Sequence, residues 1–154
     1  IINAGTARNV IPESVKLAGT IRSMNPAIRQ QLHEEMRKAC AIVESLGGRY
    51  DLNILHGYPA TVNDPEAADM ALGVLNEMLG EGNAFVKEQI MASEDFSFML
   101  QKAPGAFLRL GVKNPEWDRE YPVHTSTFQM DEDALPVGAA ALAACAVRWM
   151  QTKG

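Results

Sequence analysis

The chain has few of the residues that disulfide frameworks or nucleic-acid surfaces need. It holds two cysteines, Cys40 and Cys145, which give neither a disulfide framework nor a Cys-x-x-Cys metal pair. Each falls on an apolar helical stripe, as expected of a buried free thiol, so we expect a reducing, cytoplasmic environment. The net charge is −5, and no run of Lys or Arg forms the basic stripe that nucleic acid or an anionic membrane surface attracts.

Long apolar runs are also lacking. The longest, residues 134–147, is Ala-rich, contains Pro136 and Gly138, and is shorter than the roughly 20 residues of a membrane span. The first five residues lack an initiator Met and the basic start and apolar core of a signal peptide. They are typical of the inside of a strand, so we expect the chain to begin within a longer protein.

Hydrophobic periodicity predicts a small α+β layer over residues 1–57. Strands are expected at residues 1–4, 15–22 and 50–56, where apolar residues alternate with small or polar ones. A helix should begin at Asn25-Pro26 and end at Gly47-Gly48, since Asn caps helix starts and glycine ends helices. The expected apolar stripe of this helix consists of Ile28, Leu32, Met36, Ala39, Cys40, Val43 and Leu46.

The pattern breaks after residue 57, where we place a domain boundary, giving domains at residues 1–57 and 58–154. In the second domain, helices are expected over residues 64–80, 94–102 and 131–151, and strands over residues 84–86 and 105–111. The last helix is apolar on most sides and should pack against a sheet. The predicted fold class is therefore α/β.

One imidazole stands out in the weakly periodic stretch of residues 112–127. His124 lies in a loop that begins with a proline, just before an acidic helix start. Neutral imidazole is the commonest protein metal ligand. A lone histidine in a loop is more often an ordinary surface residue, so His124 needs support from elsewhere in the chain.

Asn9 and Arg22 form a second candidate site. Arginine presents a fixed fork of donors that matches a carboxylate, and an asparagine amide can complete the grip. The connection between them could bring both to one end of a sheet. Two alternatives stay open: Asn9 as a turn residue that bonds its own backbone, and Arg22 as a solvated charge at a strand end.

Several segments in a fixed order resemble one family. They are Gly5 to Pro12, Gly19 to Arg22, Asn63-Asp64, the Ser93-Glu94-Asp95-Phe96 motif, Pro104-Gly105 and His124 to Leu135. The pattern is similar to the metallo-amidohydrolase and peptidase family of hippurate hydrolases, N-acyl-amino-acid amidohydrolases and plant auxin-conjugate hydrolases. That family has a catalytic domain interrupted by a lid domain. The resemblance implies the end of an α+β lid (dimerisation) domain followed by the last part of an α/β metallopeptidase-like catalytic domain.

The resemblance also implies roles for individual residues. His124 matches the family's final metal ligand, and Asn9 and Arg22 match the lid residues that bind the substrate carboxylate. Glu94 and Asp95 are better explained by helix capping than by catalysis. The other ligands of two divalent ions (Zn, Mn, Co or Ni) and the general base would lie upstream. No catalytic residue is therefore expected in this chain.

Two functions follow as expectations. The first is a metal-dependent hydrolase of N-acyl amino acids, homodimeric through its lid, of which this chain alone is inactive. The alternative is a non-catalytic, lid-like α+β dimerisation module. His33 and His56 are expected to be structural or surface residues.

Overall fold

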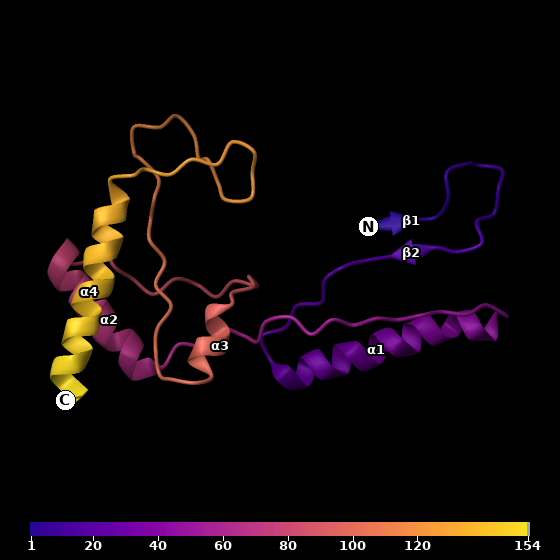
Figure 1. Cartoon of the computed structure of the whole chain (residues 1–154), viewed down its shortest axis with the longest axis horizontal. Helices are drawn as coiled ribbons and strands as arrows, with labels where there is room; N and C mark the ends of the chain where they lie inside the picture. The colour runs from indigo at the N-terminus through magenta and orange to yellow at the C-terminus, as the bar shows by residue number, and fades with distance from the viewer. Residues whose placement is uncertain (154) are drawn as a thin grey trace. The chain divides into compact units, whose positions relative to one another are not determined.

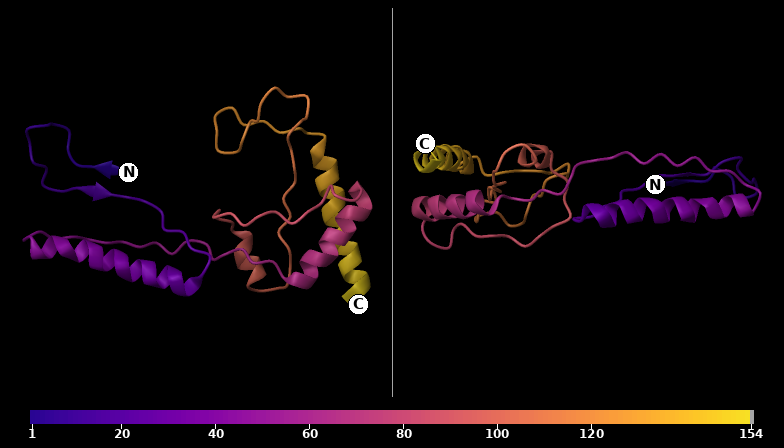
Figure 2. Two further views of the ribbon diagram at one scale, coloured as in Figure 1. Left: turned by 180° about the vertical axis from the view of Figure 1, so that it is seen from behind. Right: turned by 90° about the horizontal axis from the view of Figure 1, so that it is seen from below.

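The computed structural model describes residues 1–153, which fall into two compact units. The first unit is Ile1–Ala60 and the second begins at Thr61. Figures 1 and 2 show the helices and strands of each unit. The sequence placed the boundary a few residues earlier, after residue 57. The assignment of the two units to a lid and a catalytic domain stays a prediction.

The first unit contains one short hairpin. Strand β1 (Ile2–Asn3) pairs antiparallel with β2 (Lys16–Leu17), with Ile2 opposite Leu17. Two backbone hydrogen bonds between Ile1 and Ala18, of 2.8 and 3.0 Å, extend the pairing by one step. The predicted strand over residues 15–22 is thus much shorter than expected.

Helix α1 (Pro26–Ser45) follows, and its ends match the sequence prediction. The Asn25 Oδ1 accepts hydrogen bonds from the backbone N–H groups of Ala27 (2.8 Å) and Ile28 (3.3 Å), which satisfies donors left open at a helix start. Pro26 occupies the first turn, where its missing N–H costs nothing. After the helix, Gly47 adopts a left-handed φ of 80°, a conformation open to glycine.

The expected packing of α1 is not found. Its predicted core stripe stays partly open, with Leu32 38%, Met36 40% and Val43 40% exposed. Residues 50–56, predicted as a strand, have no regular secondary structure. The physical reason is that a strand needs a hydrogen-bonded neighbour. The only sheet within residues 1–153 consists of β1 and β2, with two residues each, and residues 50–56 do not join it.

The second unit is built on two helices that pack together (Figures 1 and 2). Helix α2 (Pro65–Leu79) is capped by Asp64, whose carboxylate accepts from the Ala67 N–H at 2.9 Å. Helix α4 (Ala134–Lys153) lies against it, and the short helix α3 (Phe96–Leu100) lies between them in the chain. The buried apolar side chains are all small: Ala67, Ala71, Val74 and Ala141.

Small side chains let α2 and α4 approach closely, and an ion pair joins them at the edge. The Arg148 guanidinium donates to both carboxylate oxygens of Glu77, at 2.6 and 3.3 Å. This pairing lowers the pKa of Glu77 and raises that of Arg148. On α4, a Cβ at Gly138 would lie 2.8 Å from the Leu110 Cδ2, so a larger residue there would make the Leu110 side chain move.

The α/β expectation for this unit needs correction. Residues 84–86 and 105–111, predicted as strands, form no regular strand, and α4 packs on a helix rather than on a sheet. Large apolar side chains of α4 remain open, with Leu142 64% and Met150 63% exposed. Residues 1–153 are thus largely helical with few strands, because the extended segments have no strand partners among them.

One helix among the described residues, α4, is long and apolar enough over Ala134–Thr152 to cross a membrane by length and composition. The longest apolar run in the sequence ends at residue 147, which is too short for a span, but the helix continues beyond it. Core helices of soluble proteins pass the same test. The absence of membrane contact therefore stays a prediction.

The α2–α4 contact yields a first prediction. Replacing Ala71 with leucine would force a larger side chain between the helices, and overpacking costs about 1–3 kcal/mol. We expect a lower midpoint of thermal unfolding, followed by circular dichroism at 222 nm. Ala146→Leu, on the exposed side of α4, is the matched control. Equal midpoints for the two variants would contradict the close packing described here.

Candidate functional site

The segment that leads to the site is tied to the start of α2. The Asp64 N–H donates to the Gly105 carbonyl at 2.9 Å, and the Phe107 N–H donates to the Asn63 Oδ1 at 2.8 Å. The Phe107 ring also lies 5.6 Å from the Phe96 ring of α3. Residues 105–107 therefore have a fixed position, although they are not part of a sheet.

Beyond this segment, residues 112–131 form a loop whose ends are held together. The Asp131 N–H donates to the Val112 carbonyl at 2.8 Å. Long surface loops with close ends are packed by their own side chains and are frequently functional. This loop joins the segment after Phe107 to the start of α4.

An aromatic cluster organises the first half of the loop. The rings of Trp117 and Tyr121 meet edge to face with centroids 5.4 Å apart, and the Arg119 guanidinium lies 4.9 Å from the centre of the Tyr121 ring. Such contacts contribute about 0.5–1.5 kcal/mol each. The sequence analysis missed this cluster. Its signal was the spacing of two large aromatic residues in a chain with only 6% aromatics.

The second half of the loop presents His124. Its φ is 64°, which makes it the non-glycine residue of the described chain with a left-handed backbone. The Thr125 hydroxyl donates to the Pro122 carbonyl at 2.8 Å, and the Gln129 N–H approaches the Tyr121 carbonyl at 3.5 Å. These two hydrogen bonds close a tight turn around position 124, and the His124 imidazole is exposed. Histidine is one of the few residue types enriched in this conformation.

The described residues do not complete a metal site around His124. Across residues 1–153, no group of three or more His, Cys, Asp or Glu side chains is arranged to hold a metal ion. A catalytic divalent ion usually has three protein ligands. The chain therefore offers one imidazole in a suitable loop, and the role of His124 as a ligand stays a prediction.

The acidic residues of the two motifs that resemble the family have local partners. The Asp131 carboxylate accepts from the Asp133 N–H at 3.1 Å, just before α4. The Glu94 carboxylate approaches the Phe96 N–H at 3.5 Å, and the Glu94 carbonyl accepts from the Ser97 hydroxyl at the start of α3. Asp95 makes no side-chain capping bond. The expected capping role thus falls to Glu94, through a long contact.

Asn9 and Arg22 both belong to the first unit, and both side chains are exposed. Asn9 lies in the connection between β1 and β2, whereas Arg22 follows the far end of β2. The hairpin therefore separates them along its length. The expectation that both reach one end of the sheet is not met within this chain. Their role in binding a carboxylate stays a prediction.

Comparison with known proteins shows the family. Residues 4–148 match the model of Peptidase family M20/M25/M40, and the chain belongs to this family. The resemblance inferred from the sequence motifs is thereby confirmed. No solved structure is a significant match to the chain.

The relatives are much longer than this chain. Thermostable carboxypeptidase 1 of Saccharolobus solfataricus is 37% identical over 153 residues, covering 96% of this chain and 37% of the relative. IAA-amino acid hydrolase ILR1-like 2 of Arabidopsis thaliana is 33% identical over 157 residues, covering 99% of this chain and 35% of the relative. A putative glutamate--cysteine ligase 2-3 of Rhodococcus jostii is 33% identical over 144 residues, covering 93% of this chain and 18% of the relative. The chain thus spans little more than a third of the length of the first two.

The aromatic cluster gives a second prediction. Tyr121→Ala should loosen the turn that carries His124, because the ring contacts with Trp117 and Arg119 would be lost. We expect faster amide hydrogen exchange over residues 122–129, measured by mass spectrometry. Tyr121→Phe keeps the ring and should exchange like the unchanged chain. If the alanine variant exchanges no faster than the phenylalanine variant, the cluster does not hold the turn.

Proposed function

We propose that the protein containing this chain is a metal-dependent hydrolase that cleaves the amide bond of N-acyl amino acids. The family match over residues 4–148 carries this proposal. Two relatives are named as a carboxypeptidase and as an IAA-amino acid hydrolase, and both names describe hydrolysis beside an amino acid. The substrates proposed are hippurate-like or acetylated amino acids.

Three residues of this chain take part in the proposal. His124 contributes one ligand to a centre of two divalent ions, and its exposed, left-handed turn supports that role. Asn9 and Arg22 match the family residues that bind the free carboxylate of the substrate, and we assign them that role in the complete protein, although the hairpin holds them apart in this chain. The remaining ligands and the general base come from outside these residues, so the chain alone is inactive.

A non-catalytic dimerisation module is the second candidate. It is favoured by the exposed apolar side chains of α1 and by the open edges of the β1–β2 pair. Unpaired strand edges and apolar helix faces attract a second chain. Dimerisation through residues 1–57 is also compatible with the hydrolase. We also propose that the protein is cytoplasmic.

The test compares this chain with the complete protein encoded by its gene. Each is assayed for metal content by mass spectrometry and for hydrolysis of hippurate and N-acetyl amino acids. We expect about two bound metal ions and turnover in the complete protein, and neither in the chain alone. A complete protein with no metal and no turnover would favour the dimerisation module.

His124 gives a third prediction. His124→Asn keeps a residue type that tolerates a left-handed backbone and removes the imidazole. Losing a residue that hydrogen-bonds to a metal ligand lowers metal affinity roughly 10–100-fold. Losing the ligand itself should lower the metal affinity of the complete protein at least as much. His56→Gln, the loss of another exposed histidine, is the control. Unchanged metal content in His124→Asn would remove His124 from the site.

Arg22 gives a fourth prediction. A hydrogen bond to a charged group contributes about 1.5–3 kcal/mol, so Arg22→Met should raise KM in the complete protein by roughly 10–150-fold. The control substrate carries a carboxamide in place of the free carboxylate. The Arg22→Met variant should lose little activity toward this control substrate. Equal losses for both substrates would mean that Arg22 does not bind the carboxylate.

A further inference from the structure

Two histidines of the first unit meet where α1 faces the extended residues 50–58. His33 lies near the middle of α1 and is only 5% exposed, although the rest of the helix is largely open. Its ring contacts the ring of His56 edge to face, with centroids 5.2 Å apart. Figure 1 shows residues 50–58 running back along α1. The histidine pair is thus a contact between the helix and the returning chain.

A second contact lies one helical turn away. The Arg29 guanidinium donates to the backbone carbonyl of Tyr58, two residues beyond His56. Arg29 precedes His33 by four residues, so both project from the same side of α1. The returning chain is therefore held at two neighbouring points, by one side chain on each of two successive turns.

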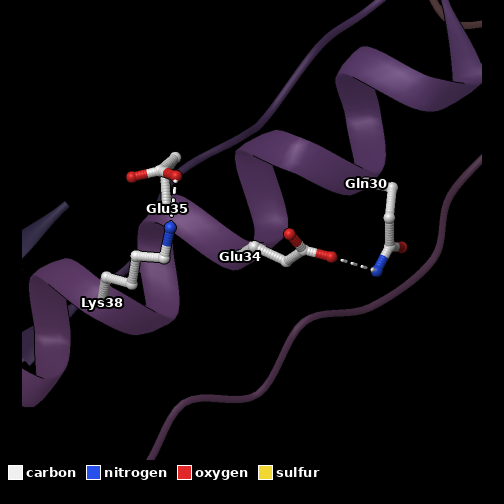
Figure 3. A network of polar contacts seen from close by, with 4 residues as sticks. All are labelled: Gln30, Glu34, Glu35 and Lys38. Atoms are coloured by element: carbon white, nitrogen blue, oxygen red, sulfur yellow. Dashed lines mark hydrogen bonds and ion pairs between the residues drawn. The ribbon is translucent and has the colours of Figure 1, made fainter.

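The groups that lower the pKa of His33 are all basic. Arg29 and Arg37, one turn before and one turn after it on α1, and His56 on the returning chain are the groups that act on it. The nearest carboxylates of α1 have other partners (Figure 3). Glu34 accepts from Gln30 at 3.3 Å, and Glu35 pairs with Lys38 at 2.8 Å. A proton on His33 would therefore place a buried cation beside other cations without a carboxylate to balance it.

The pKa of His33 is lowered, first by burial and then by the neighbouring His56, Arg37 and Arg29. The folded state consequently binds fewer protons than the unfolded state just below the ordinary histidine pKa of about 6.5. Stability must then rise with pH across this range. The contribution is complete above about pH 6.5 and is lost as the pH falls toward the lowered value.

We propose that His33 and His56 form a pH-sensitive clasp, which holds residues 50–58 against α1 at neutral pH and releases them as the medium becomes mildly acidic. Opening lets the His33 imidazole take up a proton in water rather than in a buried, cationic setting. The released segment is the one that leads from α1 to the end of the first unit at Ala60.

The same surroundings argue against a metal site at this pair. Two imidazoles could hold a transition-metal ion, but Arg29 and Arg37 would repel it. Residues 1–153 also supply no third ligand at this position. A titrating clasp is therefore the better explanation of two adjacent histidines in a chain that has only three.

The test follows nuclear Overhauser contacts between residues 56–58 and α1 in the full chain between pH 7.5 and 5.5. The ratio of held to released chains should fall by up to about tenfold per pH unit below about 6.5, the limit for one linked proton. Two variants of His33 separate charge from shape. His33→Gln stays neutral and should keep the contacts of Tyr58 with α1 at both pH values, whereas His33→Lys carries a permanent charge and should lose them already at pH 7.5.

His124→Asn is the matched control, because it removes a histidine from the second unit and keeps a residue type that tolerates the left-handed backbone. It should retain the full pH dependence of the unchanged chain. Contacts of residues 56–58 with α1 that do not vary with pH would overturn the proposal. So would a His33→Gln variant that opens at pH 5.5 as far as the unchanged chain. Contacts within α1 itself are read in the same experiment, so unfolding of the helix is distinguished from release of the clasp.

Discussion

The close contact of α2 and α4 is the constraint on which the second unit depends. It is made by small side chains, and the Glu77–Arg148 pair joins the two helices at one edge. From α2, Asn63 and Asp64 hold residues 105–107; from the start of α4, Asp131 closes the loop of residues 112–131. The loop that carries His124 is therefore anchored next to the starts of both helices.

Helices were predictable from the sequence because their signals are local. Asn25-Pro26 and Asp64-Pro65 each combine an N-cap with proline in the first turn, and glycines follow both helices. Strands were not predictable in the same way. Residues 50–56 and 105–111 have alternating or apolar patterns, but a strand also needs a partner, and the described residues pair only Ile2–Asn3 with Lys16–Leu17.

The candidate site was predictable in its residues and less so in its geometry. Six segments in a fixed order predicted the family, but no local signal predicted the left-handed backbone of His124 or the packing of Trp117 on Tyr121. The connection between Asn9 and Arg22 could have brought both near one end of a sheet, but the hairpin places them apart, because β2 lies between them in the chain. No group of three metal-ligating side chains forms within residues 1–153, so a complete ligand set could not be predicted from these residues.

The left-handed turn at position 124 has an evolutionary consequence. Few residue types occupy such a backbone cheaply, namely glycine and, among side chains, mainly Asn, Asp and His. Drift at this position would therefore favour Asn or Gly, and either would erase the imidazole while leaving the loop intact. With the role proposed for His124, a descendant could keep the loop and lose the metal ligand through one substitution. The residue at position 124 would then indicate activity better than the shape of the loop does.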